Sequence, residues 1–408
     1  MPDDTPRRTY TDLFRTPEFS PLFLSSSANI AAQTVSGLAL GTLVFRATNS
    51  PLLSALSMFG PALAQVLGAT FFLSGADRLP PRATLAGLAL AFAGATSALA
   101  LPGLPVWAML VIVLAEGLIA SLGGGVRWGL LTEILSKDGY LSGRSLFNMM
   151  SGVMQIAGYA AGGVLVAVLS PRLCLLLAAA LYGTSAALAL RLTRRPPRAS
   201  GRPSVRATWS ANARLWSAPA RRHVYLALWI PNGLVVGCES LYVSYDPRAA
   251  GTLFACAALG MLAGDVTVGR LLPPRLRPRL GIPLLVLLAA PYLVLFLRPP
   301  LPLTAVLVAL ASFGFGASLV QQERLVALTP DGLSGHALGL HSAGMLTMQG
   351  VAATAAGTVA QLTSPATAMT VMALASLTVT FALTAVSRRG ATDGGLWPTR
   401  AAGAVRAT

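Results

Sequence analysis

The sequence predicts an all-α membrane protein with twelve transmembrane helices, arranged as two parallel six-helix repeats. Two observations predict the membrane: 54% of the 408 residues are hydrophobic and only 11% are charged, whereas soluble proteins carry about 25% charged residues. The mean hydropathy of +0.66 agrees with them. A third observation predicts the repeat, because short motifs recur along the chain at one constant separation.

Each predicted helix is an apolar run long enough to cross a bilayer, which takes about 20 residues at about 1.5 Å per residue. Only helices and closed barrels satisfy every backbone group in lipid. Barrel strands are short and alternate polar with apolar residues, and these runs do neither. The predicted spans are 20–45, 51–74, 83–101, 105–127, 145–169, 172–192, 223–245, 249–268, 281–297, 301–320, 337–361 and 365–387.

The longest polar interruption, residues 191–222, separates six spans from six and contains Arg but no Asp or Glu. Trp209 and Trp216 within it are seven residues apart and would share a helical face. This spacing predicts a short helix in the headgroup layer; a disordered linker is the alternative. We expect five segments: an N-terminal segment 1–19, a bundle 20–192, a basic linker 193–222, a bundle 223–387 and a tail 388–408.

The net charge of +16 is distributed unevenly. With both termini in the cytoplasm, all but four of the 30 Lys and Arg residues lie on the inner side, and the four are Arg46, Arg172, Arg248 and Arg298. This asymmetry is typical of a multi-pass protein of the inner cell membrane. The basic residues then orient the chain and contact lipid headgroups, so no nucleic-acid partner is expected.

The duplication is visible in motifs separated by 192 residues. LSGRSL at 141–146 recurs as LSGHAL at 333–338. Arg78 and Pro81 recur as Arg270 and Pro273, and Gly152 and Gly158 recur as Gly344 and Gly350. Because six spans bring the chain back to the same side, the two halves are expected to be parallel repeats.

The loop after the second span reads SGADRLPPR at 74–82, with Asp77, Arg78 and Arg82 at signature positions. Together with the twelve spans, the duplication and the central basic loop, this loop resembles the major facilitator superfamily, and drug exporters within it, over about residues 15–388. The match is partial, because Pro80 and Pro81 replace a Gly and a basic residue of the signature. The resemblance implies a secondary transporter that works by alternating access.

Charged residues at the cytoplasmic ends of spans predict a latch between the two bundles. Asp77 can meet Arg127 of the fourth span, and Asp265 with Arg324 would be the equivalent pair in the second half. Arg78, Arg82 and Arg270 belong to the same motif and its repeat. A few kcal/mol from such pairs shifts a two-state equilibrium substantially. The alternative is that the carboxylates only anchor the topology and cap helices.

Two acids within spans are candidates for proton coupling. Glu116 stands near the middle of the fourth span, and Glu239 lies in the seventh, nearer the outer side. Ionisable residues inside the membrane are costly and usually functional. The alternative is a protonated acid that serves only as a hydrogen bond between helices.

Four polar residues within spans are candidates for the substrate cavity, if the first and seventh spans line it as the resemblance implies. They are Asn29 and Gln33 in the first span, Gln155 in the fifth and Asn232 in the seventh. The alternative is that each side chain only forms a hydrogen bond between helices, which stabilises the packing by about 0.6–2 kcal/mol.

Several function classes lack support in the sequence. It has no phosphate-binding Gly-Lys-Ser/Thr motif, no metal-ligand spacing and no nucleophile–base constellation, so neither an enzyme nor a cofactor is expected. We expect proton-coupled efflux of a small amphipathic compound or drug by a monomer in contact with membrane lipids. An importer or facilitator of a small metabolite is the alternative, and a non-transporting receptor or scaffold is an alternative of another class.

Overall fold

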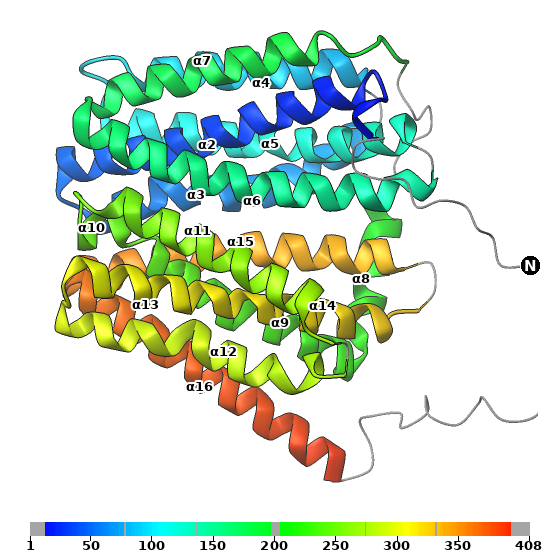
Figure 1. Cartoon of the computed structure of the whole chain (residues 1–408), viewed down its shortest axis with the longest axis vertical. Helices are drawn as coiled ribbons and strands as arrows, with labels where there is room; N and C mark the ends of the chain where they lie inside the picture. Colours follow the sequence, from blue (N-terminus) through cyan, green and yellow to red (C-terminus); the bar gives the residue numbers. More distant parts are fainter. Residues whose placement is uncertain are drawn as a thin grey trace, which may run out of the picture.

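The computed structural model describes residues 13–76, 79–135, 137–196, 205–273, 275–330 and 333–392, and no strand occurs among them. Figure 1 shows two stacked groups of helices with the chain order of the two predicted bundles. The upper group, here called the N half, contains α2 (Phe19–Thr48), α3 (Pro51–Ala76), α4 (Pro81–Leu99), α5 (Val106–Ile134), α6 (Lys137–Val168) and α7 (Pro171–Ala189).

The lower group, here called the C half, follows α8 (Val205–Ser217) in the chain. It has more breaks in its helices than the N half. Its elements are α9 (Pro219–Glu239), α10 (Tyr242–Tyr245), α11 (Ala250–Val266), η1 (Thr267–Leu271), α12 (Arg277–Val294), η2 (Leu295–Leu297), α13 (Leu301–Phe313), η3 (Gly314–Gly316), α14 (Ala317–Ala327), α15 (Ser334–Leu362) and α16 (Pro365–Thr392).

The sequence explains where many of these helices start. Proline fixes φ near the helical value and has no N–H to leave unpaired, so it suits the first helical position. Five long helices begin at a proline, namely Pro51, Pro81, Pro171, Pro219 and Pro365. Four of these prolines follow a turn between two apolar runs, and Pro219 follows α8 of the basic linker. The turns explain why most predicted span limits lie close to the observed ones.

The span count by length and hydropathy is one fewer than predicted. Among the described residues, eleven helical segments are long and apolar enough to cross a membrane. The predicted span 337–361 lies within α15, which is 29 residues long but is not one of the eleven. Its many Gly, Ser, Thr, His and Gln residues lower its hydropathy. α15 packs between α3 of the N half and α9 of its own half. Because these helices cover much of its surface, only a small part of α15 has to be apolar in order to face lipid.

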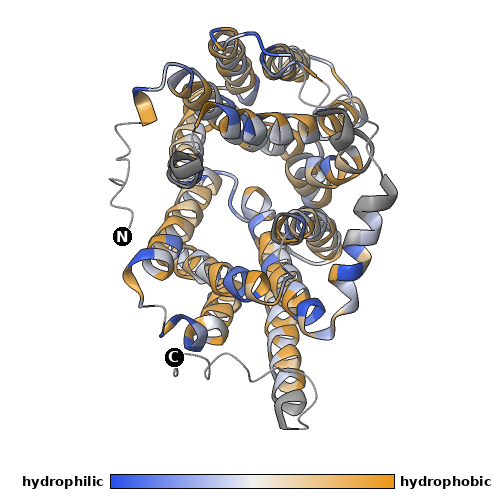
Figure 2. Cartoon of the chain, turned by 90° about the vertical axis from the view of Figure 1, so that its right-hand side faces the viewer, coloured by the Kyte–Doolittle hydropathy of each residue, from blue (hydrophilic) through white to orange (hydrophobic). Residues whose placement is uncertain are grey.

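The two halves meet along a surface that we call the seam, where α3 packs on α15 and α6 packs on α11. The linker end of the molecule holds α8 and the chain between the halves, at the right of Figure 1. The opposite end holds the turns at Asn49, Asp246 and Arg298. Figure 2 looks at the linker end and shows the helices nearly end-on, with largely apolar ribbons.

The repeat is visible in the helix arrangement, but the register read from the glycines is wrong. Gly158 faces Thr34 of α2 within its own half, whereas Gly350, 192 residues later, faces Leu63 of α3 across the seam. Gly163 is the better counterpart of Gly357, because each approaches the first turn of a helix in the other half. A shift of two residues turns a helix face by about 200°, so a sequence match alone does not fix which face is equivalent.

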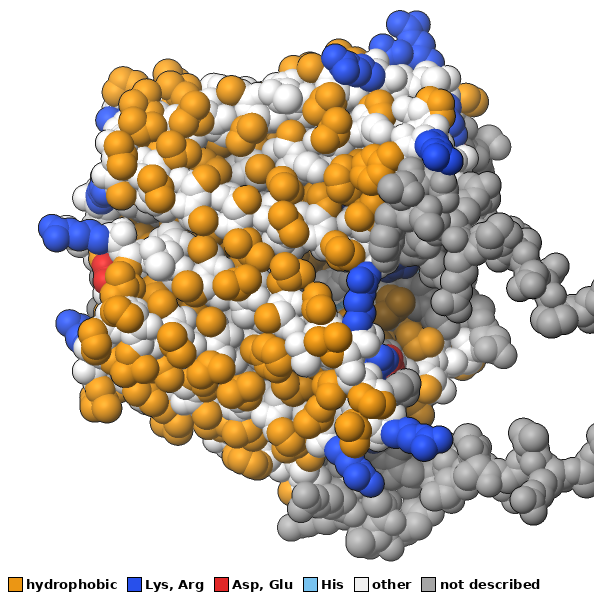
Figure 3. All heavy atoms as spheres, in the orientation of Figure 1, with side chains coloured by type: hydrophobic (Ala, Val, Ile, Leu, Met, Phe, Trp, Pro, Cys, Tyr) orange, Lys and Arg blue, Asp and Glu red, His pale blue; other side chains and the backbone are white. Residues whose placement is uncertain are grey.

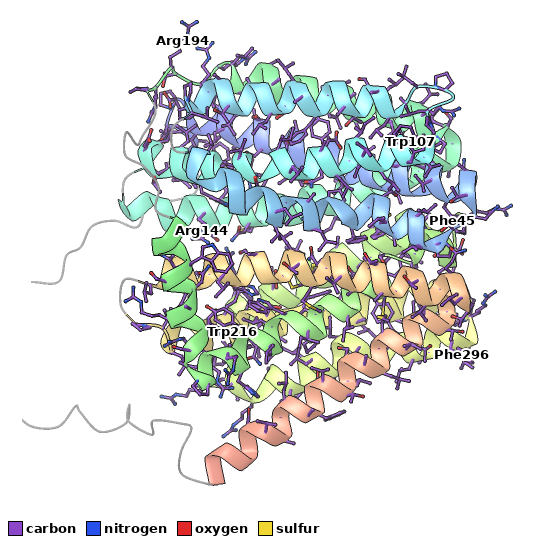
Figure 4. The ribbon with its side chains drawn as sticks, turned by 180° about the vertical axis from the view of Figure 1, so that it is seen from behind. Phe45, Trp107, Arg144, Arg194, Trp216 and Phe296 are labelled. Carbon is purple, nitrogen blue, oxygen red and sulfur yellow. The ribbon has the colours of Figure 1, made fainter. Side chains whose placement is uncertain are left out.

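The linker contains the predicted helix. In α8, Trp209 is 63% exposed and Trp216 is 37% exposed. The ring of Trp216 stacks on Trp229 of α9 at 5.5 Å between centroids, with an interplanar angle of 10°. Figure 4 shows Trp216 on α8, which crosses the linker end beside the C half. α8 is therefore attached to the C half through an aromatic stack.

Candidate functional site

Among the predicted site acids that the structure describes, Glu239 is the most deeply buried. It is the last residue of α9, and only 6% of its surface is exposed. The Ser312 hydroxyl of α13 donates to its Oε1 at 3.4 Å. No cation among the described residues interacts with the carboxyl. A charged group buried without a partner costs several kcal/mol, so this surrounding suits a neutral carboxylic acid.

Hydroxyl groups extend the surroundings of Glu239 deep into the C half. Tyr242 and Tyr292 are fully buried, and their hydroxyl oxygens lie 2.5 Å apart. The Ser312 side chain is also close to Tyr292, so Glu239 and the tyrosine pair share this serine as a neighbour. The network joins α9, α10, α12 and α13 away from lipid and water. A proton on Glu239 would therefore sit in a preformed set of hydrogen-bonding partners.

Residues of the seam lie close to this network. Tyr159 of α6 is near enough to interact electrostatically with Glu239, although it belongs to the N half. Its ring stacks on Phe254 of α11 at 4.8 Å between centroids and an interplanar angle of 18°. The C-half carboxyl is thus within electrostatic range of a tyrosine whose stacking on Phe254 exists only when the two halves meet.

The seam is tightly closed at the opposite end. The Ser50 hydroxyl donates to Oε1 of Gln361 at 2.7 Å, across the two halves. Gly163 and Gly251 approach so closely that a Cβ on Gly163 would lie 2.6 Å from the Cα of Gly251. Near the linker end, Figure 3 shows the surface hollowed between the halves, with Lys or Arg side chains in the hollow. Among the described residues, the tight closure of the seam therefore lies at the opposite end.

Glu116 points away from the seam. The Thr96 hydroxyl of α4 donates to its Oε1 at 3.3 Å, and Tyr182 of α7 is within electrostatic range. α4 and α7 form the layer of the N half that lies farthest from the C half in Figure 1. The carboxyl is half-buried inside one bundle, where a rocking motion of the halves changes its surroundings less than those of Glu239.

The four cavity candidates differ in exposure. Asn29 and Gln155 are half-buried and Gln33 is exposed, whereas Asn232 is only 1% exposed. The Nδ2 of Asn232 donates to the Leu228 carbonyl at 2.6 Å, and its Oδ1 has no partner among the described residues. Asn232 thus bonds within α9 next to Pro231, a proline inside the continuous helix that has no N–H for the backbone ladder.

The predicted N-half latch falls partly outside the described residues, which exclude Asp77 and Arg78. Its other member, Arg127, has a buried Nε without a hydrogen-bond partner among the described residues. The guanidinium carbons of Arg127 and Arg144 lie 5.1 and 5.6 Å from the centre of the Trp128 ring. Figure 4 shows Arg144 at the linker end between the halves. Arg82 is half-buried near the start of α4.

The predicted C-half latch residues lie at the same end. Asp265 and Arg324 are exposed, and their pairing stays a prediction. Arg270 lies in η1, a π-helical turn, and its Nη2 donates to Sδ of Met149 across the seam at 3.4 Å. π-Helical turns are rare and frequently occur at functional sites.

Arg277 is a linker-end residue that the sequence did not single out. It pairs with Glu323 at 2.5 Å and donates to the carbonyls of Gly269 and Leu272 at 2.9 and 3.2 Å. It therefore fixes the chain that follows η1. Together with Gln322 it also lines a cavity of about 540 Å³ between η1, α12, α14 and α15.

The family follows from a sequence match over most of the chain. The sequence model of the Major Facilitator Superfamily matches residues 22–322. The chain belongs to this superfamily. A search of curated proteins found no match.

Solved transporter structures show the same fold over nearly the whole length of this chain. A POT family transporter in complex with 5-aminolevulinic acid has a TM-score of 0.72 at 10% identity, over 91% of this chain and 96% of that one. A bacterial homolog of the human lysosomal transporter Spinster, in an inward-facing and unoccupied conformation, has a TM-score of 0.72 at 14% identity, over 95% and 99%. The nucleoside transporter NupG has a TM-score of 0.72 at 14% identity, over 90% and 99%.

Family and fold together make this protein a multi-pass membrane transporter of the secondary type rather than an enzyme. The described residues contain no group of three His, Cys, Asp or Glu side chains that could hold a metal ion. The candidate site residues of this major facilitator protein are single acids, hydroxyls and arginines, of which Glu239 is close to the seam and Glu116 lies away from it.

The partners of the two acids were missed in the sequence. Thr96, Ser312, Tyr242 and Tyr292 lie in different helices from the acids they surround. Single Ser, Thr and Tyr residues are common in apolar spans, so none of them gives a motif. The only available signal was indirect, since a buried acid needs hydrogen-bonding partners.

Proposed function

We propose that this protein exports a small amphipathic compound in exchange for protons, by alternating access across the inner cell membrane. Both termini lie in the cytoplasm, so the linker end faces the cytoplasm. One chain contains both halves and works as a monomer. The substrate enters between the halves from the linker end and leaves at the opposite end.

The observation that carries the proton coupling is the position of Glu239. Its carboxyl is buried close to hydroxyl groups without a described cation, and it is within electrostatic range of Tyr159 from the other half. In the closed arrangement this setting favours the neutral acid, because desolvating an unpaired charge is costly. Opening the opposite end would separate Tyr159 from Phe254 and admit water to the carboxyl.

This geometry couples protonation to the opening of the seam. When the opposite end is open, Glu239 exchanges its proton with the outer solution. When that end closes again, the carboxyl carries this proton into the closed arrangement, whose surroundings suit the neutral acid. Substrate that enters from the linker end then brings water to the carboxyl, and the proton leaves toward the linker end, so that a proton moves inward for the substrate that moves outward. A difference of about 5.5 kcal/mol between the two arrangements suffices to move such an equilibrium from one side almost completely to the other. Glu116 lacks this contact with the other half and is the second candidate.

The composition of the helices supports an amphipathic substrate. The spans provide apolar walls, and the candidates provide scattered amide groups, with Asn29 and Gln33 in α2 and Gln155 in the seam helix α6. Apolar pockets with few polar groups bind amphipathic molecules.

The test is proton movement in liposomes that contain the purified protein and a pH-sensitive dye in the lumen. Ethidium and a panel of lipophilic cations and antibiotics are added in turn. We expect at least one compound to cause proton flux with the wild type, no flux with Glu239→Gln, and intermediate flux with Glu239→Asp. Substrate flux without any proton movement would contradict antiport. Accumulation in the direction of the proton gradient would instead indicate an importer.

A further inference from the structure

A cavity of about 280 Å³ crosses the closed part of the seam at the opposite end. Thr42 and Arg46 of α2 and Gly163 of α6 line it from the N half. Arg248 and Gly251 line it from the C half. Because both halves contribute walls, the cavity exists in this form only while the opposite end is closed.

The cavity has one arginine from each half. Arg46 and Arg248 are both exposed, and neither has an ion pair with any described residue. The loops of the opposite end are fully described and contain a single acid, Asp246. Its Oδ1 accepts the backbone amides of Arg248 and Ala249, at 3.1 Å each, so it caps the local turn.

The start of α11 adds positive potential to the same cavity. Ala249 precedes this 17-residue helix, provides no side-chain cap, and no acid stands in the first turn. Ala250 and Gly251 line the cavity, and the first amides of a helix have no partner within it. A helix N-terminus carries about half a positive charge, which adds to the charges of Arg46 and Arg248.

These charges oppose closure of the seam. Two like charges brought together from opposite halves repel each other, although Gly163 and Gly251 hold the backbones in contact here. An anion between the two arginines reverses the sign of this effect, because it attracts both halves. Arginine binds phosphate oxygens with two parallel hydrogen bonds, which makes it well suited to this ligand.

We propose that this cavity binds a phosphate group, and that the bound phosphate holds the opposite end of the seam closed. The headgroup of an anionic phospholipid and free inorganic phosphate both carry this chemistry with a net negative charge, whereas the phosphate of phosphatidylcholine is balanced by its own choline cation. The inference concerns the closed state only and does not depend on proton coupling or on the direction of transport.

The experiment measures closure directly, without transport. Ser50 and Gln361, which hydrogen-bond across the seam, are replaced together by Cys, and the half-buried Cys256 is replaced by Ala. The rate at which a short bismaleimide joins the two cysteines reports how often the opposite end is closed. The full-length protein is placed in phosphatidylcholine vesicles, with or without phosphatidylglycerol, or with inorganic phosphate added.

We expect phosphatidylglycerol to accelerate cross-linking by about fivefold or more, a typical size for coupling between sites. Acceleration by inorganic phosphate in phosphatidylcholine alone would identify a soluble anion as the ligand. Arg46→Gln and Arg248→Gln should each abolish the acceleration. Arg172→Gln, at an exposed position of the same end outside the cavity, should retain it.

Three results would overturn the proposal. The first is a wild-type cross-linking rate that is the same in all vesicles. The second is a response of the two cavity variants that equals that of the wild type. The third is a loss of the response in Arg172→Gln as well, which would mean that the net surface charge acts without a site. Because all three substitutions are at exposed positions, the thermal unfolding of each variant is expected to match that of the wild type.

Discussion

Gly163 of α6 and Gly251 of α11 meet backbone to backbone across the seam. A Cβ on Gly163 would lie 2.6 Å from the Cα of Gly251, and one on Gly251 would overlap Gly163 even more closely. Side chains at these two positions would hold the halves apart. This contact therefore sets how completely the opposite end closes.

We expect Gly251→Val to keep the opposite end open, because the added side chain cannot fit against α6. The bismaleimide cross-link between cysteines at positions 50 and 361 should slow by about tenfold or more. Gly87→Val is the matched control, since nothing lies within 4 Å of a Cβ built there. Cross-linking of Gly251→Val at the wild-type rate would show that the seam closes elsewhere.

Ser312 hydrogen-bonds to Glu239 and is close to the tyrosine pair. Ser312→Ala should therefore remove a hydrogen bond of the Glu239 carboxyl and a polar neighbour of the two tyrosine hydroxyls. Leaving a buried polar group without its partner costs about 1–3 kcal/mol. Thermal unfolding in detergent should show this loss of stability. Ser240→Ala is the control, because the Ser240 hydroxyl is equally buried but bonds only to the Gly237 carbonyl of its own helix. Equal losses in both variants would remove the argument for a network.

Arg221 connects the linker helix to the C half. Its guanidinium donates to the carbonyls of Arg214 and Leu215 at the end of α8, at 2.8 and 3.1 Å, and to the carbonyl of Leu328 after α14 at 3.1 Å. Arg221→Gln should lower stability by about 1–2 kcal/mol, since hydrogen bonds to charged groups are the stronger ones.

The neighbouring Arg222 has an exposed side chain, so Arg222→Gln is the control for the loss of charge. We also expect faster proteolysis within α8 in Arg221→Gln alone. If both variants are cleaved equally fast, the capping of α8 is not what protects it.

The apolar runs predicted most helices closely, because a bilayer imposes length and hydropathy on every span. α15 is the exception: its polar residues are tolerated because α3 and α9 cover it. Packing between helices is invisible in a hydropathy profile. The same reason explains the glycine register, since Gly158 and Gly350 match in sequence but face different halves.

The two acids were predicted as candidates, but their roles were not distinguishable in the sequence. Glu116 and Glu239 are both single acids in apolar spans. Their surroundings in the folded protein distinguish them. Glu116 faces α4 and α7, whereas Glu239 is within electrostatic range of Tyr159 of the other half. An electrostatic interaction between residues 80 positions apart, in different halves, leaves no local pattern.

The most direct test of the proposed coupling compares two kinds of transport in liposomes, with ethidium or the active compound of the panel as probe. Glu239→Gln should still exchange labelled for unlabelled compound at equilibrium, because exchange needs only the movement of the halves. It should lose accumulation driven by a pH gradient, whereas Glu116→Gln should keep it. Gradient-driven accumulation by Glu239→Gln at the wild-type level would contradict the assignment of the proton to this residue.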